Sequence, residues 1–431
     1  MKTIEVEVVS KKIIKPSSPT PQHLHHYQLS FLDQIAPPVY NPCVMFYSNQ
    51  ADLDEISHKL KKSLSDVLTK FYPLAGRLKE NLFIDCNDEG IPFLVAKVKC
   101  QLYDVIQNPA PNELNKFIPF ESDKVTDLVL GIQLNIFECG GIAIGSCISH
   151  KVADGLSSFM FLKSWAATAR GDLQMVHPQF VSATLFPPKN ISGFNPRVGM
   201  TNEKNIVSKR FVFSAAMMEA LREKYGHAKS LEKKTRPTRV EALSAFLWSR
   251  FVAASQVDTD GAEAKQAFYA IVHAVNLRTR IDPPLSDDSF GNLFRMAITI
   301  PSSGEEGCDL VKKMSDQISH INIEYVRKLQ EEGMEHLNFI KDRSEMFFKG
   351  EMISFNLTSW CRFPVYESDF GWGKPAWVGS PPFNIKNLVV LVDTKSGHGI
   401  EAFINLEEQV MAKFECDKES LAFLSPNGLK Y

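Results

Sequence analysis

Residues 150–155, with the sequence HKVADG, separate a strand pattern from a helix pattern. The nine residues before them, 141–149 (GIAIGSCIS), are apolar or small and predict a buried strand. The residues after them place apolar side chains at helical spacing as far as Gly171. His150 therefore stands where a strand passes into a helix, and there its side chain can face a cleft and accept a proton near neutral pH. Asp154 follows one helical turn later and carries a charge that an imidazolium or an arginine would attract.

A second short motif, DFGWG, stands near the end of the chain at residues 369–373 and is followed by Lys374. Two glycines around a tryptophan predict a tight backbone turn that packs against a large ring. Its first three letters also occur in protein kinases, but the chain lacks the Gly-rich phosphate loop, the strand lysine and the H-R-D loop that a kinase needs. We therefore interpret the segment as a structural motif made by Asp369, Phe370, Gly371, Trp372 and Gly373.

The pair of motifs, H-x-x-x-D-G in the first half and D-F-G-W-G near the end, resembles the BAHD acyltransferases, plant enzymes that move an acyl group from coenzyme A to an alcohol or an amine. The resemblance extends over essentially the whole chain. It is strongest with the vinorine synthase-like branch, whose members acetylate alkaloids and terpenoids. The further segments that carry it are 14–21, 29–34, 71–77 (FYPLAGR), 85–88, 137–141, 274–278, 291–292 and 358–362.

Strand and helix patterns interleave in both halves, which predicts an α/β protein, and 431 residues are too many for one ordinary core. We expect an N-terminal domain at 1–186 with the H-x-x-x-D motif, a linker at 187–205 without apolar periodicity, and a C-terminal domain at 206–431 with D-F-G-W-G. The resemblance implies two similarly folded mixed-sheet domains of the chloramphenicol acetyltransferase type around a central solvent channel.

Hydrophobic periodicity predicts further elements on both sides of the expected linker. The expected helices are 51–71, 214–225, 238–254 and 309–328. The third of them opens with a capping box, in which Thr238 is the N-cap and Glu241 stands three residues later. The expected strands are 81–85, 93–98, 128–137, 268–277, 352–359 and 388–394, with an edge strand at the alternating residues 1–12.

The composition is that of a globular protein without a nucleic-acid partner. A formal net charge of −2 gives no basic excess for nucleic acid, and no run approaches the roughly 18 apolar residues of a membrane helix. Since the N-terminus is unlike a signal peptide, we expect a cytoplasmic protein, and one chain, a monomer, suffices for the chemistry. The eight cysteines contain no C-x-x-C, and the histidines at 23, 25 and 26 lack acidic or cysteine neighbours, so we expect free thiols and no metal site.

His150 is the candidate general base for acyl transfer, because the attacking hydroxyl must lose its proton. A positioned base of this kind contributes roughly 10²–10⁴-fold to the rate. The acceptor itself can attack the thioester, so we expect a ternary complex and no acyl-enzyme. Cys147 is the nucleophile of a competing ping-pong hypothesis, but strand alternation turns it to the face opposite His150.

The resemblance implies roles for several further residues. Asp154 is expected to form a buried ion pair with Arg278 and to hold the His150 loop. Trp360 could donate its indole N–H to the oxyanion, with ordinary core packing as the alternative, and Thr358 is expected to touch the acceptor. The residues expected to meet coenzyme A, which brings the acetyl group, are Thr235, Arg236, Thr238 and Lys374.

Three alternatives stay open beside transfer from acetyl-CoA. A related enzyme could use a longer or aromatic acyl donor, or an amine acceptor. A catalytically inactive binding homologue is disfavoured, because the base and its neighbours are intact. A metal-dependent hydrolase with His150 and Asp154 as ligands lacks a third ligand within the motif. The expected partners are an acyl-CoA and a small hydroxylated acceptor, and the sequence does not choose between an alkaloid and a terpenoid.

Overall fold

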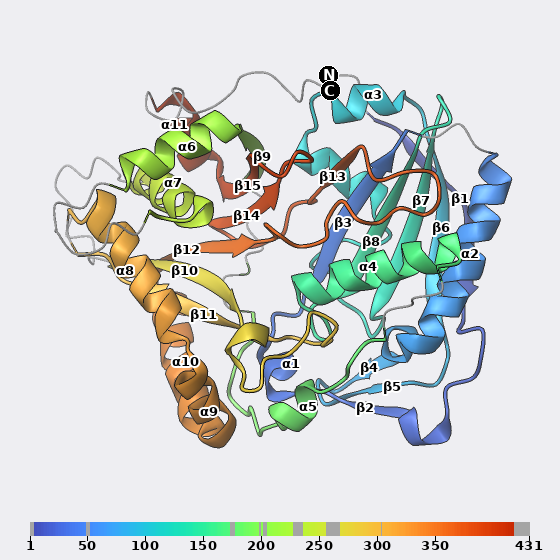
Figure 1. Ribbon diagram of the computed structural model, residues 1–431, viewed down its shortest axis with the longest axis horizontal. Coiled ribbons are helices and arrows are strands. Elements are labelled where there is room, and N and C mark those ends of the chain that lie inside the picture. Colours follow the sequence, from blue (N-terminus) through green and yellow to red (C-terminus); the bar gives the residue numbers. More distant parts are fainter. Residues whose placement is uncertain are drawn as a thin grey trace.

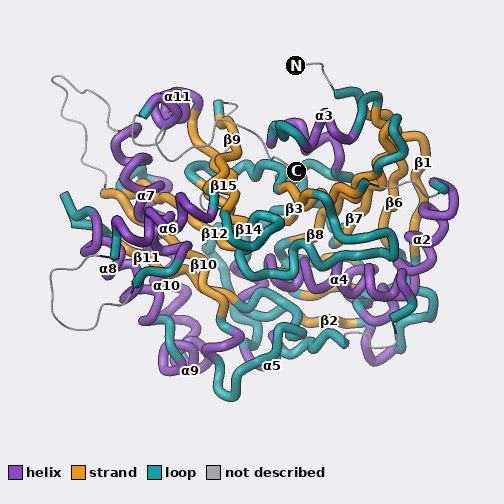
Figure 2. Tube along the Cα trace, turned by 45° about the horizontal axis from the view of Figure 1, so that its top comes forward, coloured by secondary structure: helices purple, strands orange, loops and turns teal. Residues whose placement is uncertain are grey.

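The computed structural model describes residues 4–48, 52–172, 177–197, 200, 205–226, 236–255, 268–302 and 304–417. Two six-stranded sheets lie side by side, the first built mainly from the N-terminal half and the second from the C-terminal half (Figures 1 and 2). Each sheet mixes parallel and antiparallel pairs and carries helices, so the α/β fold class predicted from the sequence is confirmed.

The first sheet contains the strand that ends at His150. Its strands are, in spatial order, β1 (Val6–Ile14), β6 (Ile91–Val98), β7 (Leu130–Phe137), β8 (Ile142–Ser149), β3 (Tyr40–Tyr47) and β13 (Trp377–Gly379). Every residue of β8 is buried, as expected of an apolar strand inside a covered sheet. Helix α4 (Gly155–Arg170) follows and packs against α2 (Leu53–Lys70) (Figure 1). The strand and the helix predicted on the two sides of residues 150–155 are therefore confirmed.

The second sheet lies beside the first (Figure 1). Its strands are, in spatial order, β11 (Phe294–Thr299), β10 (Phe268–Asn276), β12 (Met352–Ser359), β14 (Leu388–Asp393), β15 (Ile400–Glu407) and β9 (Ile206–Phe213). Strands β10, β12 and β14 are parallel. Strand β11 pairs antiparallel with β10, β15 pairs antiparallel with β14, and β9 pairs antiparallel with β15. The helices that share an apolar core with this sheet are α6 (Ala215–Lys224), α7 (Arg239–Ser255), α8 (Gly307–His320) and α11 (Glu408–Cys416).

Shorter elements complete the described part of the chain. A third sheet has the strands β2 (His26–Gln28), β5 (Phe83–Asp85) and β4 (Arg77–Lys79). The remaining helices are α1 (Phe31–Ile35), α3 (Leu102–Ile106), α5 (Ser182–Leu185), α9 (Ile323–Glu331) and α10 (Gly333–Phe348). The 3-10 helices are η1 (Gln22–Leu24), η2 (Tyr72–Ala75), η3 (Pro111–Phe117) and η4 (Arg278–Arg280). Helix α1 contains Asp33 in its first turn, and this residue is buried.

Strand β13 joins the two halves, because it comes from the C-terminal half but pairs with β3 of the first sheet. Its Trp377 also donates an indole hydrogen bond of 3.1 Å to Glu401 Oε2 on β15 of the second sheet. Residues 187–197 of the expected linker contain no helix or strand, and β9 begins at Ile206. The domain boundaries at 186 and 206 stay a prediction.

The expectation of one helix over 309–328 is wrong. Helix α8 ends at His320, and α9 begins at Ile323 with Asn322 as its N-cap. The Asn322 side chain accepts a hydrogen bond of 3.0 Å from the backbone N–H of Tyr325. Asparagine satisfies the free N–H groups of a helix start well and continues a helix poorly, so a new helix begins there.

Candidate active site

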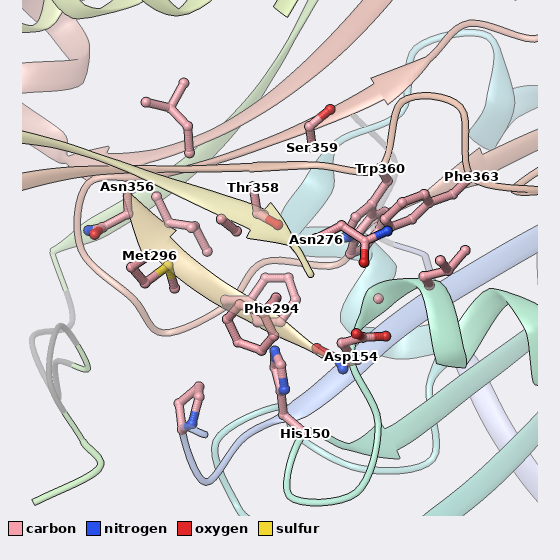
Figure 3. A pocket seen from close by; sticks show the side chains of 18 of the residues that line it. His150, Asp154, Asn276, Phe294, Met296, Asn356, Thr358, Ser359, Trp360 and Phe363 are labelled. Carbon is pink, nitrogen blue, oxygen red and sulfur yellow. The ribbon is translucent and has the colours of Figure 1, made fainter. Parts of the chain in front are cut away.

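His150 lies at the junction of the two halves and lines a cavity of about 310 Å³. Its backbone N–H donates to the carbonyl of Val39 at 2.8 Å, which fixes the residue just after β8. Figure 3 shows its ring directed toward Phe294, which comes from the second sheet. The two ring centroids are 5.5 Å apart. The structure thus places His150 in a cleft, as its position between strand and helix predicts.

Asn292 fixes the tautomer of His150. The Nδ1 atom of His150 lies 2.9 Å from Asn292 Oδ1. The amide nitrogen of Asn292 is occupied elsewhere, since it donates to Asp33 Oδ1 at 2.8 Å and to the His150 carbonyl at 2.7 Å. The amide oxygen is therefore the acceptor, and Nδ1 of His150 carries the proton. This arrangement leaves a lone pair on Nε2, which is what a general base needs.

Asp33 in turn orients Asn292. Its carboxylate is fully buried, and Oδ1 accepts from the backbone N–H of Asn292 at 3.0 Å as well as from the side-chain amide. Its Oδ2 accepts from the backbone N–H and the hydroxyl of Ser30 at 2.8 and 2.6 Å. Burial raises the pKa of the Asp33 carboxyl, and these hydrogen bonds offset part of that rise. Asp33, Asn292 and His150 thus form one hydrogen-bonded series that ends at the imidazole.

The surroundings of His150 favour its neutral form, which has a consequence for the pH dependence of the rate. Burial lowers the pKa of the imidazole below its ordinary value of 6.5, and the Asp154 carboxylate and the Asn292 hydrogen bond offset only part of this. Because the neutral imidazole is the base, kcat/KM should be level near neutral pH and fall on acidification with a midpoint below 6.5. Initial rates in a pH series measure this midpoint, and a value at or above 6.5 would contradict the prediction.

Asn292→Ala should lower kcat by about 10- to 100-fold, because a hydrogen bond to a charged group contributes about 1.5–3 kcal/mol. The charge in question is the imidazolium that forms when His150 takes the proton of the acceptor. Loss of the Asn292 acceptor also lowers the pKa of His150 further, so the acid limb of kcat/KM should move to lower pH. Steady-state rates of the purified variant across a pH series test both effects.

Asn356→Ala is a matched control for this experiment. Asn356 lines the same cavity, but its side-chain amide donates to Ser354 Oγ at 3.1 Å and makes no bond to His150 among the described residues. We expect this variant to change KM for the acceptor and to leave the acid limb in its wild-type position. A slower Asn292→Ala enzyme with an unmoved acid limb would show that Asn292 supports the fold alone.

Asp154 and Arg278 form the buried ion pair that the family resemblance implies. Arg278 Nη1 lies 2.8 Å from Asp154 Oδ2, and Nη2 lies 3.2 Å from Oδ1, which is a two-point contact. The carboxylate also accepts from the backbone N–H groups of Ser157 at 2.8 Å and Leu293 at 3.1 Å. Burial would raise the pKa of Asp154, but the Arg278 cation and these N–H groups outweigh it and hold the pKa below its ordinary value. The arrangement supports a structural role for Asp154.

Thr358 and Trp360 line the cavity from β12 and from the turn that follows it (Figure 3). Trp360 is 6% exposed, and its ring packs edge-on against Phe159 of α4, with centroids 5.2 Å apart. Gly155 permits this approach, because a Cβ there would lie 3.0 Å from the indole Nε1. Both residues therefore stand on the wall that an acceptor or an oxyanion would meet, and their roles stay predictions.

The D-F-G-W-G segment forms a turn that packs against the first half, and none of its residues lines this cavity. Asp369 Oδ1 accepts from the backbone N–H groups of Gly371 at 2.8 Å and Gly373 at 2.9 Å. The φ angles of +103° and +102° at these glycines lie in the left-handed region that favours glycine. The rings that pack around the fully buried Phe370 are those of Tyr47, Trp165 and Trp372. The geometry supports a structural turn.

Three of the residues expected to meet coenzyme A, namely Arg236, Thr238 and Lys374, are described, and they do not line this cavity. Arg236 and Lys374 are exposed and form surface ion pairs. Thr238 caps α7 as predicted, since its Oγ1 accepts from Glu241 N at 3.2 Å and its own N–H donates to Glu241 Oε2 at 2.8 Å. Thr235 lies outside the described residues. Contact with coenzyme A stays a prediction for these residues.

The cysteines give no support to a ping-pong mechanism. Cys147 is fully buried, its Sγ lies 3.5 Å from the carbonyl of Phe120, and burial raises the pKa of its thiol to about 12. Cys361 does line the cavity, which the sequence analysis missed, but burial raises the pKa of its thiol to about 12 as well. A thiol with such a pKa is a weak nucleophile near neutral pH. The described residues contain no group of three or more His, Cys, Asp or Glu side chains that could hold a metal ion.

The sequence analysis also missed the roles of Asp33 and Asn292. Ser30 and Asp33 have the spacing of a capping box, and Gly291 followed by Asn292 predicts a turn. These signals locate a helix start and a loop. Nothing local indicates that the loop meets His150, which stands 142 positions earlier in the chain.

A model of the Transferase family matches residues 4–421. The chain belongs to this family. Its members are the BAHD acyltransferases that the two sequence motifs resemble, so the predicted family and the predicted enzyme class, an acyltransferase, are confirmed. None of the described helices combines the length and the apolar composition that crossing a membrane requires.

Relatives and a solved structure match the chain along its full length. Stemmadenine O-acetyltransferase of Catharanthus roseus is 39% identical over 429 residues, which cover 97% of this chain and 98% of that protein. Limonoid 1-O-acetyltransferase of Citrus sinensis is 36% identical over 443 residues, which cover 98% and 99%. The crystal structure of vinorine synthase matches with a TM-score of 0.83 at 33% identity and covers 99% of this chain and all of its own. These matches confirm the predicted architecture of two mixed-sheet halves.

Proposed function

We propose that this acyltransferase moves an acetyl group from acetyl-CoA to a hydroxyl group of a plant specialised metabolite, an alkaloid or a terpenoid. The observation that carries the proposal is the free lone pair of His150 Nε2 in a cavity between the two halves. The acceptor class is supported by the relatives, which are named as O-acetyltransferases of stemmadenine and of a limonoid. The intact hydrogen-bonded series behind His150 disfavours an inactive binding homologue.

The reaction follows from the position of this lone pair. The acceptor hydroxyl gives its proton to His150 Nε2 while its oxygen attacks the carbonyl carbon of the thioester. The tetrahedral intermediate then collapses: the new C–O bond remains, the C–S bond breaks, and the imidazolium returns the proton to the sulfur of coenzyme A. Asn292 stabilises the imidazolium through Nδ1–H, and Trp360 stands on the wall where an N–H could meet the oxyanion.

Mass spectrometry of reaction mixtures tests the proposal. Purified enzyme is incubated with acetyl-CoA and a panel of hydroxylated alkaloids and terpenoids, with heat-denatured enzyme as the control. A product that gains one acetyl group and a stoichiometric release of free coenzyme A are expected. Product formed only with longer or aromatic acyl-CoA donors, or only with amine acceptors, would overturn the acetyl or the hydroxyl assignment. No product with any donor would overturn the proposed function as a whole.

We infer that the chain acts as a monomer in the cytoplasm. One chain supplies the complete His150 series and the Asp154–Arg278 pair, so the chemistry needs no second subunit. Size-exclusion chromatography with light scattering measures the molar mass. Microscopy of a fluorescent fusion in plant cells measures the location. A stable dimer would contradict the monomeric state, and a fluorescent signal confined to an organelle would contradict the cytoplasmic location.

A further inference from the structure

A second cavity, of about 550 Å³, adjoins the first beneath helices α8, α9 and α10. The two cavities share Phe294, Met296 and Asn356 among their lining residues, so they are adjacent to one another. The side chains around the second cavity are mostly apolar, which suits the body of a bulky ligand. Its polar lining residues include the cations Arg295 and Arg343, and the charge of the lining decides which ligand the cavity would accept.

Strand β12 shows in which direction the second cavity extends. Met352, at the start of the strand, lines the second cavity, Asn356 lines both, and Thr358, near the end, lines the first. A strand advances about 3.3 Å per residue, so the two cavities follow one another along β12. The second cavity thus lies toward the start of the strand, and the first, which His150 lines, lies toward its end.

The opposite end of β12 leads to the residues expected to meet coenzyme A. Just beyond the strand, the backbone N–H of Arg362 donates to Asp393 Oδ2 at 2.7 Å. Asp393 Oδ1 pairs with Arg239 Nη2 at 2.8 Å, and Arg239 directly follows the helix cap Thr238. The residues expected to meet coenzyme A and the second cavity therefore lie toward opposite ends of β12, with the His150 cavity between them. On this arrangement the second cavity belongs to the acceptor.

Arg295 brings an uncompensated positive charge to the second cavity. The residue lies on β11, is 9% exposed and lines the cavity. Within the described part of the chain its one hydrogen-bond partner is His336 Nε2, no carboxylate pairs with it, and its Nε has no partner. A guanidinium keeps its proton in proteins, and a buried charge without a counter-charge is costly. An electron-rich group of a ligand would remove this cost.

His336 does not supply a compensating charge. Arginine can only donate hydrogen bonds, so Nε2 of His336 accepts. Burial and the Arg295 cation lower the pKa of His336 to about 3, so the imidazole is neutral at physiological pH. Of the described residues that line the two cavities, Asp154 is the one with a carboxylate, and Arg278 engages it. Arg343 adds a further cation to the wall of the second cavity.

We propose that the second cavity binds the body of the acceptor and that Arg295 donates a hydrogen bond to a carbonyl or carboxylate oxygen on it. The inference rests on the proposed acyl transfer and adds the charge of the acceptor to it. A protonated amine in this cavity would meet Arg295 and Arg343 without a carboxylate to balance it. The acceptor is therefore a neutral or anionic alcohol, such as an oxygenated terpenoid, or an alkaloid whose nitrogen is not protonated at this position.

The wild-type enzyme can be tested with four analogues of one polycyclic alcohol that the enzyme acetylates. They share the reacting hydroxyl and differ at the far end, which carries a methyl group, a methyl ester, a carboxylate or a dimethylammonium group. We expect KM for the ester or the carboxylate to be about 10- to 100-fold lower than KM for the methyl analogue. This ratio corresponds to the contribution of one hydrogen bond from a charged donor. The ammonium analogue should have the highest KM, and the order of ester and carboxylate identifies which oxygen Arg295 prefers.

Arg295→Met tests the residue itself. The ratio of KM between the methyl and the ester analogue should fall to about one, because the donor is gone and the apolar contact remains. If the methionine variant does not fold, Arg295→Gln can replace it, because glutamine keeps an N–H donor of similar reach without the charge. Arg295→Gln should lower KM for the ammonium analogue relative to the wild type. Arg327→Met is the matched control: Arg327 lies exposed on α9 and pairs with Asp282, so this variant should keep the wild-type ratio.

The outcomes separate this inference from the proposed function. If no analogue and no panel compound is acetylated, the proposed function fails. If analogues are acetylated but the ammonium compound binds as well as the ester, the assignment of Arg295 fails while the acyltransferase stands. Thermal shifts of the enzyme with each analogue in the absence of acetyl-CoA give the same ranking without turnover. A KM ratio that persists in Arg295→Met would also overturn the inference.

Discussion

His150→Ala should lower kcat/KM for acetyl transfer by about 10²–10⁴-fold, the usual contribution of a positioned general base. No other described group on the cavity wall offers a free lone pair of similar basicity. Asp154 is engaged by Arg278, and Cys361 keeps its proton because burial raises the pKa of its thiol to about 12. Without the imidazole, the hydroxyl would have to release its proton to water while it attacks.

The same substitution should leave the fold intact, which makes the loss of rate interpretable. The backbone of residue 150 keeps its hydrogen bonds to the Val39 carbonyl and from the Asn292 amide. The lost side chain makes one hydrogen bond, to Asn292 Oδ1, which contributes about 1 kcal/mol to stability. Steady-state rates and thermal unfolding of wild type and variant, measured side by side, separate the two effects.

His58→Ala is the matched control, because His58 is exposed on α2 and does not line the cavity. It should behave like the wild type in rate and in unfolding. Added imidazole should restore part of the activity of His150→Ala, since the removed side chain leaves room beside Asn292. A folded His150→Ala enzyme that turns over as fast as the wild type would refute the general-base mechanism.

Local patterns predict the part of the site around His150. The apolar run 141–149 and the helical spacing that follows it depend on near neighbours in sequence, and the structure agrees with both. The Thr238–Glu241 capping box is local for the same reason. Such features follow from the geometry of single elements and need no knowledge of the tertiary fold.

Pairing of distant segments is what the sequence does not predict. Strand β3 was not predicted, and its Asn41 and Pro42 argue locally against a strand inside a sheet. It nevertheless lies between β8 and β13, fully buried. The lack of a carboxylate partner for Arg295 among the described residues is likewise a tertiary property. Its hydrogen-bond partner, His336, lies on α10, 41 positions later in the chain. Register and contact between remote segments decide both cases.

The turn at Gly291 connects the base to the ion pair. Its φ of +137° and the 2.6 Å that would separate a Cβ from Ser182 Oγ both require glycine. Its carbonyl accepts from the backbone N–H of Asp154 at 3.3 Å, and the two residues that follow it bond to His150 and to Asp154. A change at Asp154 is therefore expected to disturb the orientation of His150 through this turn.

Asp154→Asn should lower the free energy of unfolding by about 3–5 kcal/mol and reduce turnover together, because it breaks a buried ion pair and leaves one partner charged. Asparagine can still accept from Ser157 N–H and cap α4, but it cannot neutralise Arg278, which is 1% exposed. In the wild type the pKa of Asp154 is lowered on folding. The stabilisation is therefore present above the ordinary value of 3.8 and is lost as the pH falls through the lower pKa of the folded state.

Urea unfolding and steady-state rates of Asp154→Asn, Arg278→Gln and the double variant measure the pair. The loss in the double variant should be smaller than the sum of the two single losses, because the second substitution removes the stranded charge. Glu5→Gln is the control, since the Glu5–Lys99 pair is solvent-exposed and its loss should leave unfolding unchanged. If Asp154→Asn unfolded like the wild type yet lost its activity, Asp154 would act on the reaction directly, and the ion pair could no longer explain its presence beside His150.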